Sequence, residues 1–205
     1  YSPAITDFII MTRKSSTMYI TGPAVVKDVL SEEVTHEQLG GGLIHAQRSG
    51  VCQFLAADDE GAIATAIDLL SYMPQSYREQ PPVGETNDSA DREDLSLRDV
   101  VPADTNKPYD VKDVIHKVVD DGEFLEVHRL YAPNMVVGFA RLSGRPVGII
   151  ANQAKFMAGV LDINASDKAS RFIRFCDAFN IPLLTLVDVP GYMPGTAQEH
   201  GGIIR

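Results

Sequence analysis

The carboxyl-terminal third of the chain contains its most continuous apolar run. Residues Ile181 to Val189 include six Ile, Leu or Val residues, and Pro190 follows them. This pattern predicts a strand buried on both faces, as in a parallel sheet. Proline lacks the backbone donor that a sheet ladder needs, so we expect the strand to end there. The loop PGYMPG then hangs at the carboxyl end of a strand, where open α/β sheets bind ligands.

The region before this run alternates between strand and helix patterns. Strands are expected at 124–131, 134–143 and 146–153, and helices at 109–124 and 167–179. A hairpin turn at 143–146 is expected between the second and third of these strands. Asn164 or Ser166 can cap the second helix. Cys176 lies on the apolar stripe of that helix, so we interpret it as a small buried hydrophobe. The apolar loops 155–161 and 190–195 both follow strands, and we expect them to lie near one another.

The amino-terminal region predicts a smaller set of elements. Two short strands are expected within residues 1–20, and helices at 22–30, 36–41 and 58–74. The apolar stripe of the last helix is interpreted as core packing: Ile63, Ala66, Ile67 and Leu70. His45 has no His, Cys or carboxylate at ligand spacing, so we interpret it as a hydrogen-bonded structural histidine and not as a metal ligand.

Residues 75–108 differ in composition from both flanking regions. They contain Pro81, Pro82 and Gly84, many acidic residues and few large apolar side chains. Such a segment is typical of a solvated connector between two packed units. We therefore divide the chain into a first unit at 1–78, an acidic connector at 79–108 and a second unit at 109–205.

The composition excludes several classes of protein. The 205 residues carry a net charge of −10, and without a concentrated basic stretch this argues against nucleic-acid binding. No apolar run is long enough to span a bilayer. Two cysteines do not make a disulfide framework, so reduced, cytoplasmic chemistry is expected. Because the sequence opens without Met and stops where an apolar pattern begins, we expect an internal piece of a longer polypeptide.

The sequence contains no recognisable set of catalytic side chains. It has no CxxC motif, no phosphate-binding loop and no evident Ser-His-Asp or Cys-His arrangement. Asp188 and His200 flank the PGYMPG loop, and for Asp188 we favour a hydrogen bond to the loop backbone. The absence of an acid–base set suits chemistry in which backbone amides stabilise an oxyanion and a cofactor supplies the reactive atom.

Long stretches of the chain resemble one enzyme family. NMVVGFARLSGRPVGIIANQ and AGVLDINASDKASRFIRFCDAFNIPLLTLVDVPGYMPGTAQEHGGIIR resemble the carboxyltransferase (beta) subunit of biotin-dependent acyl-CoA carboxylases, of the propionyl-CoA carboxylase type. YSPAITDFIIM and YITGPAVVKDVLSEEVTHEQLGG resemble the same family in the same order. The resemblance implies an α/β fold of tandem crotonase-like domains. Residues 1–78 would end the N-terminal domain, 79–108 would be its acidic connector, and 109–205 would begin the C-terminal domain.

The same resemblance implies a reaction. A carboxyl group would pass from carboxybiotin, held by a carrier protein, to the α-carbon of a short-chain acyl-CoA such as propionyl-CoA, giving methylmalonyl-CoA. The biotin nitrogen would act as the base, and no metal would be needed. The implied partners are acyl-CoA, a biotin carboxylase or biotin carrier subunit, and further copies of the chain in a hexamer, in the cytoplasm of a bacterium.

Three alternatives remain open. One is the carboxyltransferase subunit of a sodium-pumping methylmalonyl-CoA decarboxylase. Another is a crotonase-like hydratase or isomerase that needs no biotin, although no carboxylate pair suited to it is evident. The last is a non-catalytic piece that only assembles with partner subunits.

The resemblance also assigns positions at the site. Both oxyanion-hole pairs are expected outside the chain, before Tyr1 and beyond Arg205, so the 205 residues should contain no catalytic residue and be inactive alone. Tyr1 and Ser2 are expected on the acyl-CoA side. The biotin/acyl pocket is expected to be lined by Gly191, Tyr192, Met193, Pro194, Phe156, Met157, Gly159 and Val160. Two departures from the family are Ala154, where Pro is usual, and Tyr192, where Phe is common.

Overall fold

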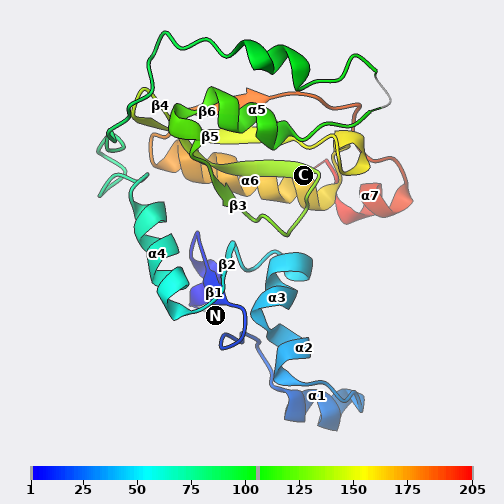
Figure 1. Ribbon diagram of the computed structural model, residues 1–205. Coiled ribbons are helices and arrows are strands. Elements are labelled where there is room, and N and C mark those ends of the chain that lie inside the picture. Colours follow the sequence, from blue (N-terminus) through cyan, green and yellow to red (C-terminus); the bar gives the residue numbers. More distant parts are fainter. Residues whose placement is uncertain (1, 105–106, 205) are drawn as a thin grey trace. The chain divides into compact units, whose positions relative to one another are not determined.

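The computed structural model describes residues 2–104 and 107–204, which form two compact units (Figure 1). Within these residues, the first unit contains the chain up to Leu70 together with His128–Tyr131, and the second contains the remainder. No helix in the described ranges is long and apolar enough to cross a bilayer. The division into 1–78, 79–108 and 109–205 stays a prediction.

The second unit is built on a four-stranded sheet in the order β3-β4-β5-β6. Its strands are β3 (Leu125–Val127), β4 (Met135–Leu142), β5 (Arg145–Asn152) and β6 (Leu183–Leu186). The first three strands are antiparallel, whereas β6 runs parallel to β5. Ser143 and Gly144, at the β4–β5 turn, both have positive φ, as a two-residue type I′ hairpin requires. The predicted hairpin and the mixed α/β class are confirmed.

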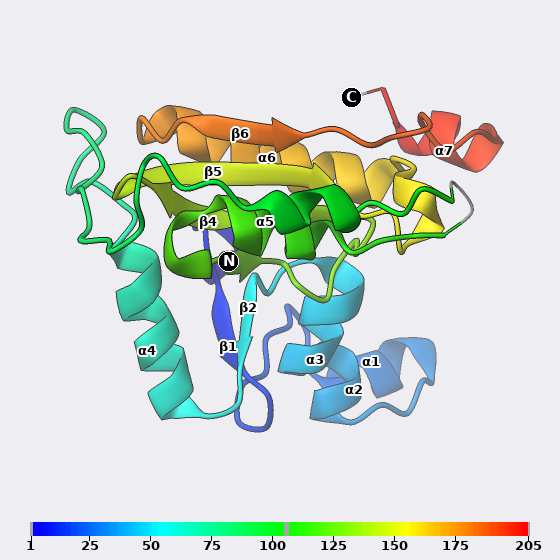
Figure 2. The same cartoon turned by 45° about the horizontal axis from the view of Figure 1, so that its top comes forward.

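Two helices cover opposite faces of this sheet, α5 (Val111–Val118) in front and α6 (Ile163–Ala178) behind (Figures 1 and 2). The strands alternate accordingly, because successive side chains of a strand point to opposite faces. Val136 and Ile149 pack with Ile115 of α5. On the other face, the ring of Phe139 lies 5.0 Å from Phe172 of α6 between centroids. β4 and β5 are therefore the strands buried on both sides.

Helix α6 begins earlier than the sequence predicted. Its N-cap is Asp162, whose carboxylate accepts a hydrogen bond from the backbone of Ala165. The assignment of Asn164 or Ser166 as the cap was wrong, because the carboxylate of Asp162, which precedes both, already accepts from an amide of the first turn. Cys176 is fully buried on the helix, and burial raises the pKa of its thiol to about 12, as expected of a packing residue.

The prediction of a long, doubly buried strand from Ile181 to Val189 was wrong. β6 has only four residues, and Leu183 is 40% exposed and Val187 73% exposed. The reason is that β6 lies at the edge of the sheet and pairs only with β5 among the described strands. An apolar run shows that a segment can be buried, but not which neighbour covers it.

Where it is described, the first unit contains a parallel pair of short strands, β1 (Ile10–Thr12) and β2 (Phe54–Ala56), together with short helices. The α-helices are α1 (Pro23–Leu30), α2 (His36–Gly40), α3 (Gly42–Ile44) and α4 (Asp59–Leu70); a 3-10 turn lies at Pro3–Ile5, and a π-helical turn, His45–Ser49, follows α3. Thr35 begins α2 with a capping box. The Nε2–H of His45 donates to the Met18 carbonyl, and Nδ1 forms a hydrogen bond with the Ser49 hydroxyl, so the structural role expected for His45 is confirmed. The second strand expected within 1–20 is reduced to an isolated bridge at Thr17.

The interpretation of the α4 stripe as core was also wrong. Ile63, Ile67 and Leu70 are 63%, 65% and 65% exposed and Ala66 is half-buried, whereas Leu69 is buried. Helix α4 packs on β1 and β2 through its other face, and within the described part of the chain nothing covers the isoleucine face. The spacing predicted the helix correctly but not which of its faces is buried.

Candidate functional site

Two loops meet at the carboxyl ends of the neighbouring strands β5 and β6. The β5–α6 loop comprises residues 153–162, and the β6–α7 loop comprises residues 187–195, before α7 (Thr196–Gly201). The backbone N–H of Leu161 donates to the carbonyl of Gly191 at 3.0 Å, and the N–H of Met193 donates to the carbonyl of Leu161 at 2.7 Å. The expectation that these loops lie together is confirmed, and Leu161 and Tyr192 form a parallel bridge between them.

The β5–α6 loop has a strained backbone. Met157 and Ala158 have φ of 52° and 53°, values that non-glycine residues rarely adopt. Gly159 follows at φ 76°, and a Cβ there would lie 2.8 Å from the carbonyl oxygen of Asp188. Only glycine permits this close approach of the two loops. Such conformations persist where the surrounding structure enforces them.

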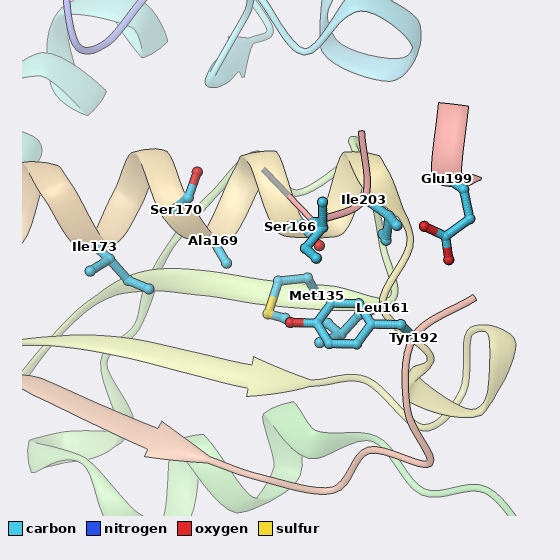
Figure 3. Close-up of a pocket in the computed structure, with 10 residues that line it drawn as sticks. Met135, Leu161, Ser166, Ala169, Ser170, Ile173, Tyr192, Glu199 and Ile203 are labelled. Atoms are coloured by element: carbon cyan, nitrogen blue, oxygen red, sulfur yellow. The ribbon is translucent and has the colours of Figure 1, made fainter. Parts of the chain in front are cut away.

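A cavity of about 520 Å³ opens beside the bridge (Figure 3). Figure 3 shows the ring of Tyr192 next to Leu161 and Met135, with α6 forming the opposite wall. The remaining lining residues come from α6 and the carboxyl-terminal segment: Ser166, Ala169, Ser170, Ile173, Glu199, Ile203 and Ile204. Tyr192 is 64% exposed and lines this cavity at the same time.

Most of this cavity is apolar, with a few polar groups. The hydroxyl of Ser166 is buried and has no hydrogen-bond partner among the described residues. The apolar lining of the cavity suits an apolar group. No cluster of three His, Cys, Asp or Glu side chains suited to a metal ion occurs in residues 2–104 and 107–204.

The predicted pocket residues are distributed around the bridge. Tyr192 is the one among them that lines the cavity. Phe156 and Met157 are about half exposed, at 47% and 48%. The side-chain amide of Asn134 donates a hydrogen bond to the carbonyl of Val160 at 2.7 Å. The roles assigned to the loop residues stay predictions, and of the two acyl-CoA positions, Ser2 is exposed and Tyr1 lies outside the described residues.

A second cavity, of about 630 Å³, lies on another side of the β6–α7 loop. Tyr109, Ala154, Ala158, Asp188, Val189 and Pro190 help to line it. The Tyr109 hydroxyl donates to the carboxylate of Asp188 at 2.9 Å. Burial, and then the hydrogen bond to Asp188, raise the pKa of Tyr109 to about 12. The tyrosine therefore remains a protonated donor at neutral pH.

Sequence reasoning missed Tyr109 and misjudged the partner of Asp188. The carboxylate was expected to bond the loop backbone, but it accepts a side chain 79 residues earlier in the chain. The backbone N–H of Asp188 in turn donates to Asn152 at 3.4 Å. Nothing in the local pattern around Tyr109 points to so distant a partner.

The start of α5 is joined to the end of β5 by a polar cluster around Gln153. Gln153, which is 1% exposed, donates to the carboxylate of Asp110 at 2.7 Å. Lys155 donates to the other oxygen of Asp110 at 3.2 Å. Burial alone would raise the pKa of Asp110, but these bonds and that from the backbone of Lys112 hold it below its ordinary value. The cluster fixes the β5–α6 loop at its beginning.

Comparison with known proteins identifies the family. The model of the family described as "Carboxyl transferase domain" matches residues 1–205. Methylmalonyl-CoA decarboxylase subunit alpha of Veillonella parvula is 57% identical over 205 residues, covering 100% of this chain and 40% of that protein. Propionyl-CoA carboxylase beta chain of Saccharopolyspora erythraea is 52% identical over 213 residues, covering 100% of this chain and 39% of that protein.

Solved structures agree with this match. The transcarboxylase 12S structure, a hexamer assembly with hydrolyzed methylmalonyl-coenzyme A bound, is 54% identical with a TM-score of 0.96, and the match covers 100% of this chain and 40% of that one. A single-chain, multi-domain long-chain acyl-CoA carboxylase is 29% identical with a TM-score of 0.81, covering 99% and 20%. The chain thus spans about 40% of the length of the curated relatives it matches. It belongs to the carboxyl transferase domain family.

Proposed function

We propose that the polypeptide containing this chain transfers a carboxyl group between carboxybiotin on a carrier protein and the α-carbon of a short-chain acyl-CoA, with propionyl-CoA and methylmalonyl-CoA as the pair. The observation that carries this proposal is the match of the family over the whole chain. Relatives at 52% and 55% identity are named propionyl-CoA carboxylase beta chain and methylmalonyl-CoA carboxyltransferase 12S subunit. Methylmalonyl-CoA is propionyl-CoA with a carboxyl group on its α-carbon, so these names describe one exchange.

A second candidate runs this exchange in the opposite direction. The 57% identity to methylmalonyl-CoA decarboxylase subunit alpha favours it. In that case the chain would take the carboxyl group from methylmalonyl-CoA and pass it to biotin. Both candidates need the same site, and the partner subunits would determine the net direction.

The site supports this chemistry through the surfaces it offers to the substrates. Tyr192, Leu161 and Met135 form an apolar wall that suits the hydrocarbon part of a ring or acyl group. Biotin, when bound, would supply the transferred carboxyl group and the base.

Several finer assignments belong to the same proposal. Gly191, Met193, Pro194, Phe156, Met157, Gly159 and Val160 would border the biotin/acyl pocket beside Tyr192, and Tyr1 and Ser2 the acyl-CoA. The oxyanion donors would lie outside the 205 residues, in a tandem crotonase-like pair of domains. The partners would be a biotin carboxylase, a biotin carrier and further copies of the chain in a hexamer, in the cytoplasm.

The complete polypeptide tests the proposal when mixed with biotin carboxylase, biotinylated carrier, ATP, labelled bicarbonate and propionyl-CoA. Labelled methylmalonyl-CoA should form, and avidin should abolish it. Product formation that avidin leaves unchanged would refute the role of biotin. Turnover of an enoyl-CoA without biotin would favour a hydratase or isomerase instead. The 205 residues alone should show no turnover, and carboxylation by them would mean that the oxyanion donors lie within the chain.

A further inference from the structure

We infer that Tyr109 is a positioning residue for the β6–α7 loop and that it acts through Asp188. The inference rests on the proposed function in one respect, because Tyr192 of this loop forms a wall of the candidate substrate cavity. It rests otherwise on a chain of hydrogen bonds that joins three separate segments of the second unit.

This series of hydrogen bonds begins at the Tyr109 hydroxyl, which donates to the Asp188 carboxylate at 2.9 Å. The backbone N–H of Asp188 points to the side-chain oxygen of Asn152 at 3.4 Å. The amide nitrogen of Asn152, a residue 6% exposed, donates to the carbonyl of Gly159 at 3.2 Å. The end of β6 is thus held from two sides, by the segment before α5 and by the end of β5.

The backbone next to Tyr109 is fixed by hydrogen bonds of Asp110. The next residue, Asp110, caps α5 and is bonded to Gln153, which follows Asn152 in the chain. Two consecutive residues before α5 are therefore hydrogen-bonded to the ends of neighbouring strands. Tyr109 bonds to Asp188, just after β6, and Asp110 bonds to Gln153, just after β5. Because Gln153 is 1% exposed and donates and accepts within this cluster, the base from which the tyrosine acts cannot shift easily.

The position of Asp188 is passed on to Tyr192 through a short and restricted backbone. Pro190 fixes its own φ, and the carbonyl of Gly191 is already bonded to Leu161. The facing loop is strained at Met157 and Ala158, and strain of this kind relaxes when its restraints are loosened. Freeing Asp188 should therefore loosen the bridge at Leu161 and Met193 before it affects the sheet.

The hydroxyl, and not the ring, is the functional part of Tyr109 in this inference. A hydrogen bond to an ionised carboxylate is about twice as strong as one between neutral groups. Burial and Asp188 raise the pKa of Tyr109 to about 12, so the donor proton is present at every physiological pH. Tyr109→Phe keeps the ring and removes this bond alone.

Amide hydrogen exchange tests the inference directly, since Leu161 and Met193 are the donors of the bridge. In Tyr109→Phe and in Asp188→Ala, exchange of these two amides should become about five- to tenfold faster, while amides of the β4–β5 ladder change less than twofold. The double variant should add nothing to either single change. Asp188→Asn, which keeps an acceptor oxygen, should restore slower exchange. The matched control is Tyr77→Phe, since Tyr77 is 62% exposed and contacts Arg78.

Two results would overturn the inference: unchanged exchange at the bridge, or an equal rise across the β4–β5 ladder, which would mean a general loss of stability. A kinetic arm uses the complete polypeptide. Tyr109→Phe should raise the KM of carboxyl transfer at least threefold with kcat within twofold, and an unchanged KM would also overturn it. If the parent enzyme transfers no carboxyl group, the proposed function fails, while hydrogen exchange still decides the role of Tyr109.

Discussion

Replacing Tyr192 tests whether the cavity beside the bridge binds a substrate. Tyr192 lies at the centre of the β6–α7 loop and forms one wall of the cavity, next to Leu161. Its side chain is 64% exposed, so most of its ring surface is available to a bound group. Tyr192→Ala removes that surface, and Tyr192→Phe retains it.

The expected effect follows from the area of the ring. A buried tyrosine covers roughly 150–250 Å², so the exposed part of Tyr192 offers about 100–150 Å² to a ligand. If a bound group covers half of it, burial of about 60 Å² at about 25 cal/mol per Å² contributes about 1.5 kcal/mol. This corresponds to about a tenfold loss of affinity in Tyr192→Ala. Tyr192→Phe should change affinity less than twofold, because no hydrogen bond of the hydroxyl is found within the described chain.

The assay is steady-state carboxyl transfer by the complete polypeptide, with acyl-CoA and biotinylated carrier varied in turn. Tyr192→Ala should raise KM for one of the two substrates about tenfold, and that substrate is the one that the cavity receives. An unchanged KM for both substrates in Tyr192→Ala would refute the assignment of the cavity. An equal loss in Tyr192→Phe would mean that the hydroxyl, and not the ring surface, makes the contact.

Three further predictions concern stability, each measured by urea unfolding. Gly159→Ala should cost about 1–3 kcal/mol, since Ala is strained at φ 76° and its Cβ meets the Asp188 carbonyl; an unaltered midpoint would contradict this. Phe139→Ala should cost about 3–5 kcal/mol, because the ring is fully buried against Phe172, and a loss below about 1 kcal/mol would contradict that packing. Burial lowers the pKa of Lys168 from 10.5 to about 7, so between these pH values the folded chain binds fewer protons than the unfolded chain. The free energy of unfolding should therefore rise with pH across this window, by at most about 1.4 kcal/mol per pH unit. Lys168→Met should remove that slope, and an unchanged slope would assign it to other groups.

The elements that the sequence predicted well are those whose pattern is local. The β4–β5 hairpin follows from two long apolar runs around the turn at Ser143 and Gly144. The apolar spacing of α5 gave its buried face, with Val111 and Ile115 in the core. In each case the spacing of apolar residues along the segment predicts both the type of element and the face that is buried.

The errors concern burial against distant partners. One face of the apolar run at β6, with Leu183 and Val187, and the stripe Ile63, Ile67, Leu70 of α4 are exposed, although both patterns suggested a core. The hydrophobicity of a segment shows which side chains can be buried. Whether they are buried depends on neighbouring segments, which a local sequence pattern does not identify. The chain spans about 40% of its relatives, so those neighbours need not lie within it.

The candidate site shows the same limit. The approach of the two apolar loops was predictable because both follow adjacent strand ends. The Tyr109–Asp188 bond was not, because its partners are 79 residues apart and neither has a pattern of its own. Tyr192 was assigned to the substrate pocket through the family resemblance; it lines a cavity, and its role there stays a prediction.

Transfer of label from methylmalonyl-CoA to a biotinylated carrier tests the central claim most directly. The complete polypeptide is incubated with methylmalonyl-CoA labelled in its free carboxyl group, and the carrier is then captured on avidin. Label should appear on the carrier, with an equal amount of propionyl-CoA released, and neither should appear with an unbiotinylated carrier. Loss of the carboxyl group at the same rate without biotin, or no transfer at all, would contradict carboxyl exchange at this site.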